Sequence, residues 1–503
     1  MLMWPGSKAV KNLLRGLLIG MMLMAHWGSA PSTLARPAVI DAAVLRALNR
    51  SGDDQLLDVI VTLRDQADFS RIDRPTVPVA LQRHAALTQS QILASLRAQP
   101  PDQVRSLTSL WIDNSIALSA SRQVIFDLAR RLDVTRIQLD ELFLMPEYAG
   151  GPATAAANLT SIGVPAVWQR GITGQGVVVA VLDSGVDMSN ADLSAKWRGG
   201  SNSWFDPYNE HTSPADLSGH GTQVLGVILG GEADGTPIGV APGARWIAAK
   251  IFNDRGRATH SAIHRALQWV LDPDGDPATA DAPQVVNNSW SSGNPGCDSD
   301  FAPDLRALRA AGILPVFAAG TDIAMAPANT PEAFAVGALE NDTTLLADSA
   351  RGPANCLNAA TVYPQLVAPG ADIHTTERSG MFANATGTSL AAAHVSGALA
   401  LLLSVNPRLS AAEQAALLIN TADDLGAHGP DNDYGYGRLN AAALIEQVAP
   451  ARISPWLMIF SGLGLVLIAA SAAVIFKRRH ARSQADPEER RVFIDTRWQD
   501  LDS

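Results

Sequence analysis

Three segments of the sequence each place one reactive side chain beside small residues. Asp183 ends the hydrophobic run 177–182. His220 stands between two glycines ahead of the apolar run 224–228, and Ser389 opens a stretch of small residues. A hydroxyl nucleophile, an imidazole that takes its proton and a carboxylate that orients the imidazole are the groups that acyl transfer from a peptide requires. If the fold brings the three side chains together, they can carry out that reaction.

Each of these residues also has a purely structural interpretation. An aspartate at the end of a strand commonly forms a turn, and a serine at the start of a helix is a common N-cap. A histidine at the start of a helix is often only structural. Taken singly, these interpretations are the commoner ones, so the argument for chemistry depends on the three residues occurring together.

The elements around these residues indicate an α/β fold. From about residue 158 to 447, β-branched runs alternate with Ala-rich helical stretches, which predicts parallel strands covered by helices on both faces. The predicted strands are 177–182, 246–251, 285–288, 314–318 and 333–336, and the predicted helices are 224–228, 260–270, 302–311 and 390–404. Asp183 would then lie at the sheet edge where such folds place their functional sites.

Residues 37–146 are predicted to form a smaller α+β domain. Its predicted strands are 57–63, 115–118 and 134–139, and its predicted helices are 80–98 and 124–132. The following stretch, 146–157, is rich in Gly, Ala and Pro and is interpreted as a linker.

The order Asp183, His220, Ser389 and the residues around each of them resemble the subtilisin-like serine proteases (subtilases). The resemblance extends over residues 158–443 and includes segments away from the three residues: Ile238–Ala244, Val367–Gly370 and Tyr434–Ala441. Three further segments are similar to the bacillopeptidase F type within that family: Pro283–Trp290, Ala310–Pro315 and Ala326–Ala333.

The resemblance implies a three-layer fold with a mostly parallel central sheet, and it assigns roles by position. Ser389 corresponds to the nucleophile, His220 to the general base and then acid, and Asp183 to the carboxylate that orients the imidazole. The edge that binds the substrate, a protein or peptide, corresponds to Ser289, Trp290 and Ser291. The expected activity is that of a serine endopeptidase.

The N-terminal domain is similar to the propeptide of the same family. The resemblance implies that residues 37–150 assist folding and inhibit the peptidase domain, 151–447, until they are cut away. The expected place of that cut is the linker 146–157.

One position departs from the family pattern. Where subtilases have an asparagine whose amide donates a hydrogen bond to the tetrahedral oxyanion, this chain has Thr321, after Ala318-Ala319-Gly320. A threonine hydroxyl can donate, but it is shorter and free to rotate toward other acceptors. In subtilisin, loss of this donor costs about 10²–10³ in kcat, so reduced activity is expected here.

Two other classes of function remain open. A non-catalytic subtilase fold would present its cleft to a peptide or cell-envelope partner, and Thr321 is the feature that favours it. A structural envelope anchor would need only a folded body and a membrane helix, and retention of Asp183, His220 and Ser389 argues against it.

An acidic turn could bind calcium through Asp272, Asp274 and Asp276. Acidic turns are also common in plain loops, and this one lacks the length and the final glutamate of an EF-hand. No cofactor is required for the predicted chemistry.

Both ends of the sequence predict contact with a membrane. Residues 1–36 have the basic, apolar and small-residue parts of a signal peptide, with an uncleaved anchor as the alternative. After the short linker 448–455, residues 456–476 form an uncharged run of 21 residues, long enough to cross a bilayer, with a buried core helix as the alternative. The basic cluster Lys477–Arg479 predicts that the tail 477–503 is cytoplasmic and the catalytic domain is outside.

Composition limits the classes of function. The 503 residues carry a net charge of −11, which gives no support to nucleic-acid binding. Cys297 and Cys356 are the two cysteines, and in an exported protein they can pair or remain free and buried. A disulfide closing a loop of this size would stabilise the fold by about 4 kcal/mol.

Overall fold

The computed structural model describes residues 39–52, 55–145, 149–151, 157–293, 296–356 and 359–449. The predicted signal peptide (1–36), membrane helix (456–476) and tail (477–503) lie outside the described residues, so they stay predictions. The described residues up to Val448 belong to one compact unit.

The N-terminal domain is a four-stranded antiparallel sheet with helices packed against it. The strand order is β2-β3-β1-β4, and β1 pairs with both β3 and β4. Its elements are β1 (Leu57–Leu63), β2 (Val104–Leu110), β3 (Ser115–Ala120), β4 (Val134–Leu139), α2 (Ala42–Arg50), α3 (Val77–Arg97), α4 (Arg122–Arg130), η1 (Phe69–Arg71) and η2 (Arg74–Thr76). Its core contains apolar residues of this domain alone, from Val44 to Ile137. The α+β prediction is therefore confirmed, although it missed α2 and β2.

The larger domain is built on a seven-stranded sheet in which all neighbouring strands are parallel. The order is β16-β13-β12-β11-β7-β9-β8. The strands are β7 (Val178–Asp183), β8 (Trp204–Phe205), β9 (Arg245–Lys250), β11 (Val285–Asn288), β12 (Pro315–Ala318), β13 (Phe334–Leu339) and β16 (Leu366–Pro369). The central strands β11, β12 and β13 are buried along their whole length, as continuous apolar runs predict.

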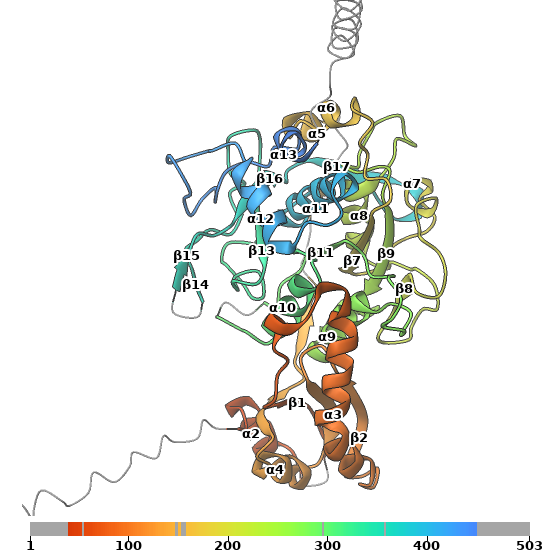
Figure 1. The fold of residues 1–503 in the computed structure, drawn as a ribbon, viewed down its shortest axis with the longest axis vertical. Coiled ribbons are helices and arrows are strands. Elements are labelled where there is room, and N and C mark those ends of the chain that lie inside the picture. Colours follow the sequence, from red (N-terminus) through yellow and green to blue (C-terminus); the bar gives the residue numbers. More distant parts are fainter. Residues whose placement is uncertain are drawn as a thin grey trace, which may run out of the picture. The chain divides into compact units, whose positions relative to one another are not determined.

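Helices cover both faces of this sheet and complete three layers (Figure 1). The helices α8 (His220–Leu229) and α11 (Thr388–Val405) pack against each other, and α11 contacts five of the strands, β7, β11, β12, β13 and β16. On the other face, α9 (His260–Leu271) and α10 (Ala302–Ala310) share one hydrophobic core with the strands. The predicted helices are confirmed, with α8 starting earlier, at His220.

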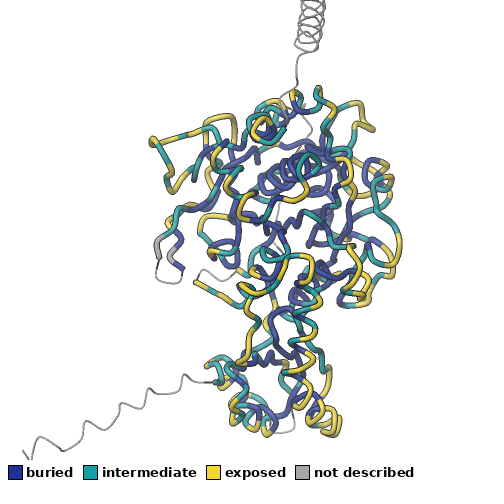
Figure 2. Tube along the Cα trace, in the orientation of Figure 1, coloured by how far each residue is buried: buried dark blue, intermediate teal, exposed yellow. Residues whose placement is uncertain are grey.

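The central helix α11 is buried in the domain, as Figure 2 shows by its dark blue trace. Among the described residues it is the one helix long and apolar enough to cross a membrane, and 83% of it is buried in the protein. Its burial fixes the position of Ser389, the second residue of the helix.

The remaining elements form small sheets and short helices around this core. They are β5 (Leu142–Leu144), β6 (Ala149–Gly151), β10 (Arg257–Thr259), β14 (Ala354–Cys356), β15 (Ala359–Thr361), β17 (Ile373–Thr376), β18 (Phe382–Thr386), α5 (Ala157–Ser161), α6 (Val164–Trp168), α7 (Ala191–Ser194), α12 (Ala411–Asn420), α13 (Ala441–Val448) and η3 (Arg378–Gly380). The stretch 146–157, predicted as a plain linker, includes β6, which pairs with β18.

Cys297 and Cys356 form a disulfide across 59 residues of sequence. The bond joins the segment before α10 to β14, so of the two states that the sequence left open the structure has the paired one.

Candidate active site

The carboxyl end of the parallel sheet brings Asp183, His220 and Ser389 together. Asp183 is the last residue of β7, His220 is the first residue of α8, and Ser389 is at the start of α11. Nδ1 of His220 lies 2.7 Å from Oδ1 of Asp183, and Nε2 lies 3.0 Å from Oγ of Ser389. Asp183 and His220 are almost fully buried. This is the arrangement of a nucleophile, a base and a group that orients the base.

Two glycines allow the start of α8 to approach β7. Gly219 has a φ of +102°, a conformation that other residues rarely adopt. A Cβ on Gly221 would lie 2.2 Å from the carbonyl oxygen of Gly185. Because both positions need glycine, the Gly-His-Gly sequence is what permits His220 to sit against Asp183.

Asp216 holds the loop before α8, and sequence reasoning missed it. Its carboxylate accepts hydrogen bonds from three backbone N–H groups within 218–222 and from the hydroxyls of Ser184 and Thr222. One carboxylate thus ties the end of β7 to the start of α8 and fixes the approach of the imidazole. Its position four residues before His220 was the available signal.

The environment of His220 favours its protonated form. Burial alone would lower the pKa of His220, but the negative charge of Asp183 and the hydrogen bond between them outweigh burial and raise it. Asp216 adds to this effect. An imidazolium formed when His220 takes the serine proton is therefore stabilised where it forms.

Ser389 is positioned by contacts with the segments that follow β11 and β12. Oγ of Ser289 donates to the carbonyl of Ser389 at 3.0 Å, and the N–H of Gly320 donates to Oγ1 of Thr388 at 3.2 Å. Because Ser389 lies in the first turn of α11, its backbone N–H belongs to the donors that a helix leaves free at its start. Such a donor can bind a developing oxyanion.

A cavity of about 580 Å³ opens over Ser389. His220, Ser289, Trp290 and Ser291 line it, so the predicted substrate edge faces the same space as His220 and Ser389. Thr321 also lines this cavity and is exposed.

The hydroxyl of Thr321 is available to a ligand. It forms no hydrogen bond with the residues that the structure describes, while the Thr321 backbone bridges to Ser349. The backbone contact fixes the position from which the hydroxyl would have to donate.

Two segments of the N-terminal half of the chain pair with strands beside this cavity. β5 pairs antiparallel with β10, a second edge that sequence reasoning missed, and Leu144 lines the cavity. β6 pairs antiparallel with β18, whose last residue, Thr386, also lines it. The chain therefore pairs with the larger domain on each side of the segment 146–148.

The acidic turn contributes two residues to a group of three close carboxylates. One oxygen each of Asp272, Asp274 and Asp281 lies within 4.8 Å of the others. Oδ1 of Asp272 is buried without a hydrogen-bond partner among the described residues. Asp276 instead accepts a hydrogen bond from the N–H of Ala278. Burial raises the pKa of Asp272 and of Asp281. These residues fit a calcium ion, and Asp281 was missed because it lies beyond the turn.

Comparison with known proteins gives matches along this domain and beyond it. The family model described as the subtilase family matches residues 174–437. Bacillopeptidase F from Bacillus subtilis (strain 168) is 34% identical over 419 residues, which cover 75% of this chain and 29% of that protein. Subtilisin BL from Lederbergia lenta is 34% identical over 289 residues, which cover 57% of this chain and 97% of that protein. Subtilisin E from Bacillus subtilis (strain 168) is 30% identical over 333 residues, or 65% of this chain and 78% of that protein. The chain thus spans less than a third of bacillopeptidase F.

Proposed function

Because the chain belongs to the subtilase family of serine proteases, we propose that it is an endopeptidase that cuts peptide bonds through an acyl-enzyme on Ser389. His220 takes the hydroxyl proton as Oγ of Ser389 bonds to the scissile carbonyl carbon, and donates it to the leaving amine as the carbon–nitrogen bond breaks. Water then attacks the ester with the same proton transfers and frees Ser389. Asp183 stays ionised and keeps Nδ1 of His220 protonated.

The oxyanion of each tetrahedral intermediate needs donors at its oxygen. The backbone N–H of Ser389 supplies one, and we propose that the hydroxyl of Thr321 supplies the second. A rotatable hydroxyl is less preorganised than an amide, so turnover is expected to be slower than in a subtilase with asparagine there.

The observation that carries the endopeptidase proposal is the hydrogen-bonded series Asp183–His220–Ser389 beneath a cavity with two strand edges. The test is to treat the detergent-solubilised full chain with a fluorophosphonate and identify the labelled peptide by mass. Label on Ser389, with loss of label and of peptide hydrolysis in Ser389→Ala, is the expected result. Identical behaviour of wild type and Ser389→Ala would overturn the proposal.

A non-catalytic peptide-binding protein is the second candidate, and Thr321 is the observation that favours it. In that case peptides would bind in the cavity with unchanged affinity in Ser389→Ala, and neither protein would hydrolyse them. Measured hydrolysis that depends on Ser389 rules it out.

We also propose that residues 37–150 are an inhibitory propeptide. One support is that β5 occupies the β10 edge of the cavity, where a substrate strand would pair. A second support is the start of α9, where the carboxylate of Asp140 accepts hydrogen bonds from the N–H and the hydroxyl of Ser261 at 2.8 and 2.6 Å. That carboxylate caps the helix N-terminus together with the hydroxyl of Thr259, which accepts from the N–H of Ala262 at 3.1 Å.

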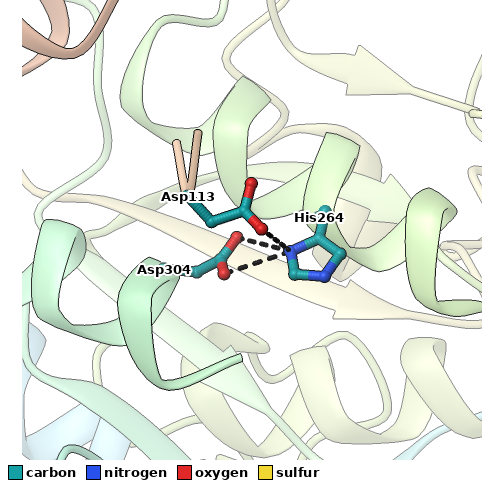
Figure 3. Close-up of side chains that lie close together, drawn as sticks. All are labelled: Asp113, His264 and Asp304. Carbon is teal, nitrogen blue, oxygen red and sulfur yellow. Dashed lines mark hydrogen bonds and ion pairs between the residues drawn. The ribbon is translucent and has the colours of Figure 1, made fainter. Parts of the chain in front are cut away.

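A buried cluster of ionisable groups lies where this domain contacts the larger one. Asp113, from the turn between β2 and β3, and Asp304, from α10, both point at Nδ1 of His264 in α9 (Figure 3). The distances to Nδ1 are 3.9 Å from Asp113 and 2.9 Å from Asp304. Burial would lower the pKa of His264, but the charges of Asp304 and then Asp113 raise it to about 10. His264 is therefore an imidazolium between two carboxylates at neutral pH.

The propeptide cut is expected between Met145 and Ala149, a narrower range than 146–157. The support is that β5 ends at Leu144 beside one edge of the cavity and β6 begins at Ala149 beside Thr386. N-terminal sequencing of mature protein should give a start within 146–149, and Ser389→Ala should keep residues 37–150 attached. Mature-sized Ser389→Ala protein would mean that another protease cuts.

Calcium is proposed to bind at Asp272, Asp274 and Asp281, with a structural role and no part in the chemistry. The close carboxylates and the partnerless oxygen of Asp272 support it. Calcium added to the chelator-treated precursor should raise its Tm, and Asp281→Asn should remove that response while Asp276→Asn keeps it. An equal response in both variants would contradict this site.

The membrane topology is proposed from sequence. The signal peptide 1–36 would export the chain, the helix 456–476 would anchor it, and Lys477–Arg479 would keep the tail in the cytoplasm. Protease added outside spheroplasts should then digest the catalytic domain and leave an epitope on the tail 477–503 protected.

A further inference from the structure

A second group of ionisable side chains lies where the N-terminal domain meets the subtilase domain. His260 is the first residue of α9, and Asp298 and Asp300 lie in the segment before α10. Nε2 of His260 lies 3.5 Å from Oδ2 of Asp300 and 4.0 Å from Oδ2 of Asp298. One ligand atom of each residue lies within 4.8 Å of the others. The mechanism at Ser389 uses none of them.

The imidazole of His260 is buried with unsatisfied nitrogen atoms. The residue is 2% exposed, and neither ring nitrogen has a hydrogen-bond partner among the described residues. The ring lies 4.4 Å from Phe143 and 5.3 Å from Phe301, measured between ring centroids, and these contacts hold its plane. Buried polar atoms normally have hydrogen-bond partners. The absence of one among the described residues at Nε2 of His260, which faces two carboxylates, therefore requires an explanation.

The distances favour an ion between these groups. A charge-assisted hydrogen bond between a nitrogen and a carboxylate oxygen is about 2.7–2.9 Å long. Two ligands at roughly 2.0–2.1 Å from one tetrahedral ion are about 3.4 Å apart. The distances from Nε2 to Asp300 and Asp298 are both too long for the first arrangement; that to Asp300 is close to the second, and that to Asp298 would shorten on ion binding.

The surrounding charges leave a deficit of positive charge. Arg136 of β4 is paired with Oδ1 of Asp300 and, at 2.8 Å, with Asp41. Leaving the imidazole out of the count, the guanidinium of Arg136 and the carboxylates of Asp41, Asp298 and Asp300 sum to a net charge of −2. A divalent cation would cancel this charge.

We propose that Nε2 of His260, Oδ2 of Asp298 and Oδ2 of Asp300 bind one divalent transition-metal ion of the zinc class, with water completing its coordination. One imidazole and two carboxylates suit zinc, whereas calcium takes oxygen ligands alone. This set is separate from the carboxylates Asp272, Asp274 and Asp281 proposed for calcium.

The ion links the two domains through its outer contacts. The three ligands belong to the subtilase domain, but Arg136 pairs with Asp300, and Gln138 donates to Oδ2 of Asp300 at 2.9 Å. Phe143 packs on His260. Such contacts orient metal ligands, and since all three come from the N-terminal domain, ion binding and docking of that domain strengthen each other. A regulatory role, in which the bound metal keeps the propeptide docked, rests on the propeptide function proposed above.

Metal binding is tested on the full-length Ser389→Ala precursor, purified with residues 37–150 attached as checked by mass, so the test does not depend on whether the wild type is a protease. The chelator-treated protein is dialysed against ZnCl₂ in excess CaCl₂, which fills sites made of carboxylates alone, and zinc per chain is measured by mass spectrometry. One zinc per chain is expected, His260→Gln should lose it, and Asp298→Asn should raise its Kd at least about tenfold. His428→Gln, which alters an exposed histidine outside the cluster, is the matched control and should keep it.

The result that overturns the site is absence of zinc uptake by the precursor, or equal uptake by the His260→Gln, Asp298→Asn and His428→Gln variants. Should His260→Gln fail to fold, Asp298→Asn decides alone, because it keeps the size of the side chain. The linkage has its own readout: zinc should slow amide hydrogen exchange in β4 and β5 of the precursor at least severalfold. Unchanged exchange with zinc bound would refute the linkage. Neither measurement requires proteolysis, so failure of the endopeptidase proposal would be seen separately, in the fluorophosphonate experiment.

Discussion

The chemistry proposed for the cleft depends on three side chains and on one donor that differs from the family pattern. Asp183 and His220 are buried and joined at 2.7 Å, so little motion remains between them. Thr321, by contrast, is exposed, and its hydroxyl must rotate toward the oxyanion. At the scale of residues, the rate is therefore expected to be limited by Thr321.

Thr321→Asn should raise kcat with little change in KM, because the added donor acts on the oxyanion of the transition state and not on the bound peptide. A gain of about tenfold or more is expected, within the 10²–10³ that this donor contributes in subtilisin. Steady-state kinetics on a peptide substrate measure it.

The paired control is Thr321→Val, which keeps the shape of the side chain and removes its hydroxyl. It should lower kcat further, again with KM little changed. Equal kcat in wild type and Thr321→Val would mean that Thr321 donates nothing.

Whole elements, and α9 in particular, connect the catalytic domain to the N-terminal domain. Asp140 caps the start of this helix. His264, about one helical turn further along, lies beside Asp113. Burial raises the pKa of Asp113 to about 6, more than the charge of His264 lowers it. A carboxyl group with a raised pKa in the docked state holds its proton more tightly there than in a separated domain.

Docking of the N-terminal domain should therefore weaken as pH rises. The contribution of Asp113 is fully present below its ordinary pKa near 4 and is lost as pH rises through about 6. Asp113 also raises the pKa of His264, and the contribution that this makes to docking is lost as pH rises through about 10. The cut propeptide should bind more weakly at pH 7 than at pH 4. The expected loss of affinity is roughly one to two orders of magnitude.

Asp113→Asn should flatten this dependence between about pH 4 and 6, since an amide does not titrate. Binding of the propeptide to mature enzyme, followed by inhibition at each pH, gives the profile. Asp102→Asn, at an exposed position, is the control and should keep the slope. A profile of Asp113→Asn that parallels wild type would contradict the assignment.

The main elements and the triad were predictable because their signals are local. The strand 285–288 and the strand 134–139 were predicted with the bounds that β11 and β4 have, since apolar runs between turns define them. β10 and β5 were missed because three-residue strands carry no periodicity and depend on each other for pairing. Asp216 and Asp281 were missed for a similar reason, since each acts through partners that only the fold brings near.

For the molecule as a whole, the disulfide and the predicted export support each other. Cys297 and Cys356 are paired, as an oxidising compartment allows. The bond holds the segment that carries Asp298 and Asp300 just before α10. The disulfide and the proposed metal site therefore lie in one region of the subtilase domain.

Replacing both cysteines, Cys297→Ser with Cys356→Ser, should lower the free energy of unfolding by roughly 2–4 kcal/mol, because the unfolded chain regains the entropy of an open loop. Denaturant unfolding of the Ser389→Ala precursor measures the change without self-digestion. Reductant added to the unaltered precursor should produce the same loss and should have no effect on the double variant. Equal stability with and without the bond would contradict the prediction.

The pairing of β5 and β6 on either side of the segment 146–148 has a kinetic consequence for the proposed activation. Because β5 and β6 belong to the same chain as the cleft, their local concentration at the cleft does not change when the protein is diluted. The first cut should then be a unimolecular event whose half-life is the same at nanomolar and micromolar precursor. Sparse molecules on a membrane surface would mature as fast as crowded ones, and each would do so without meeting another copy.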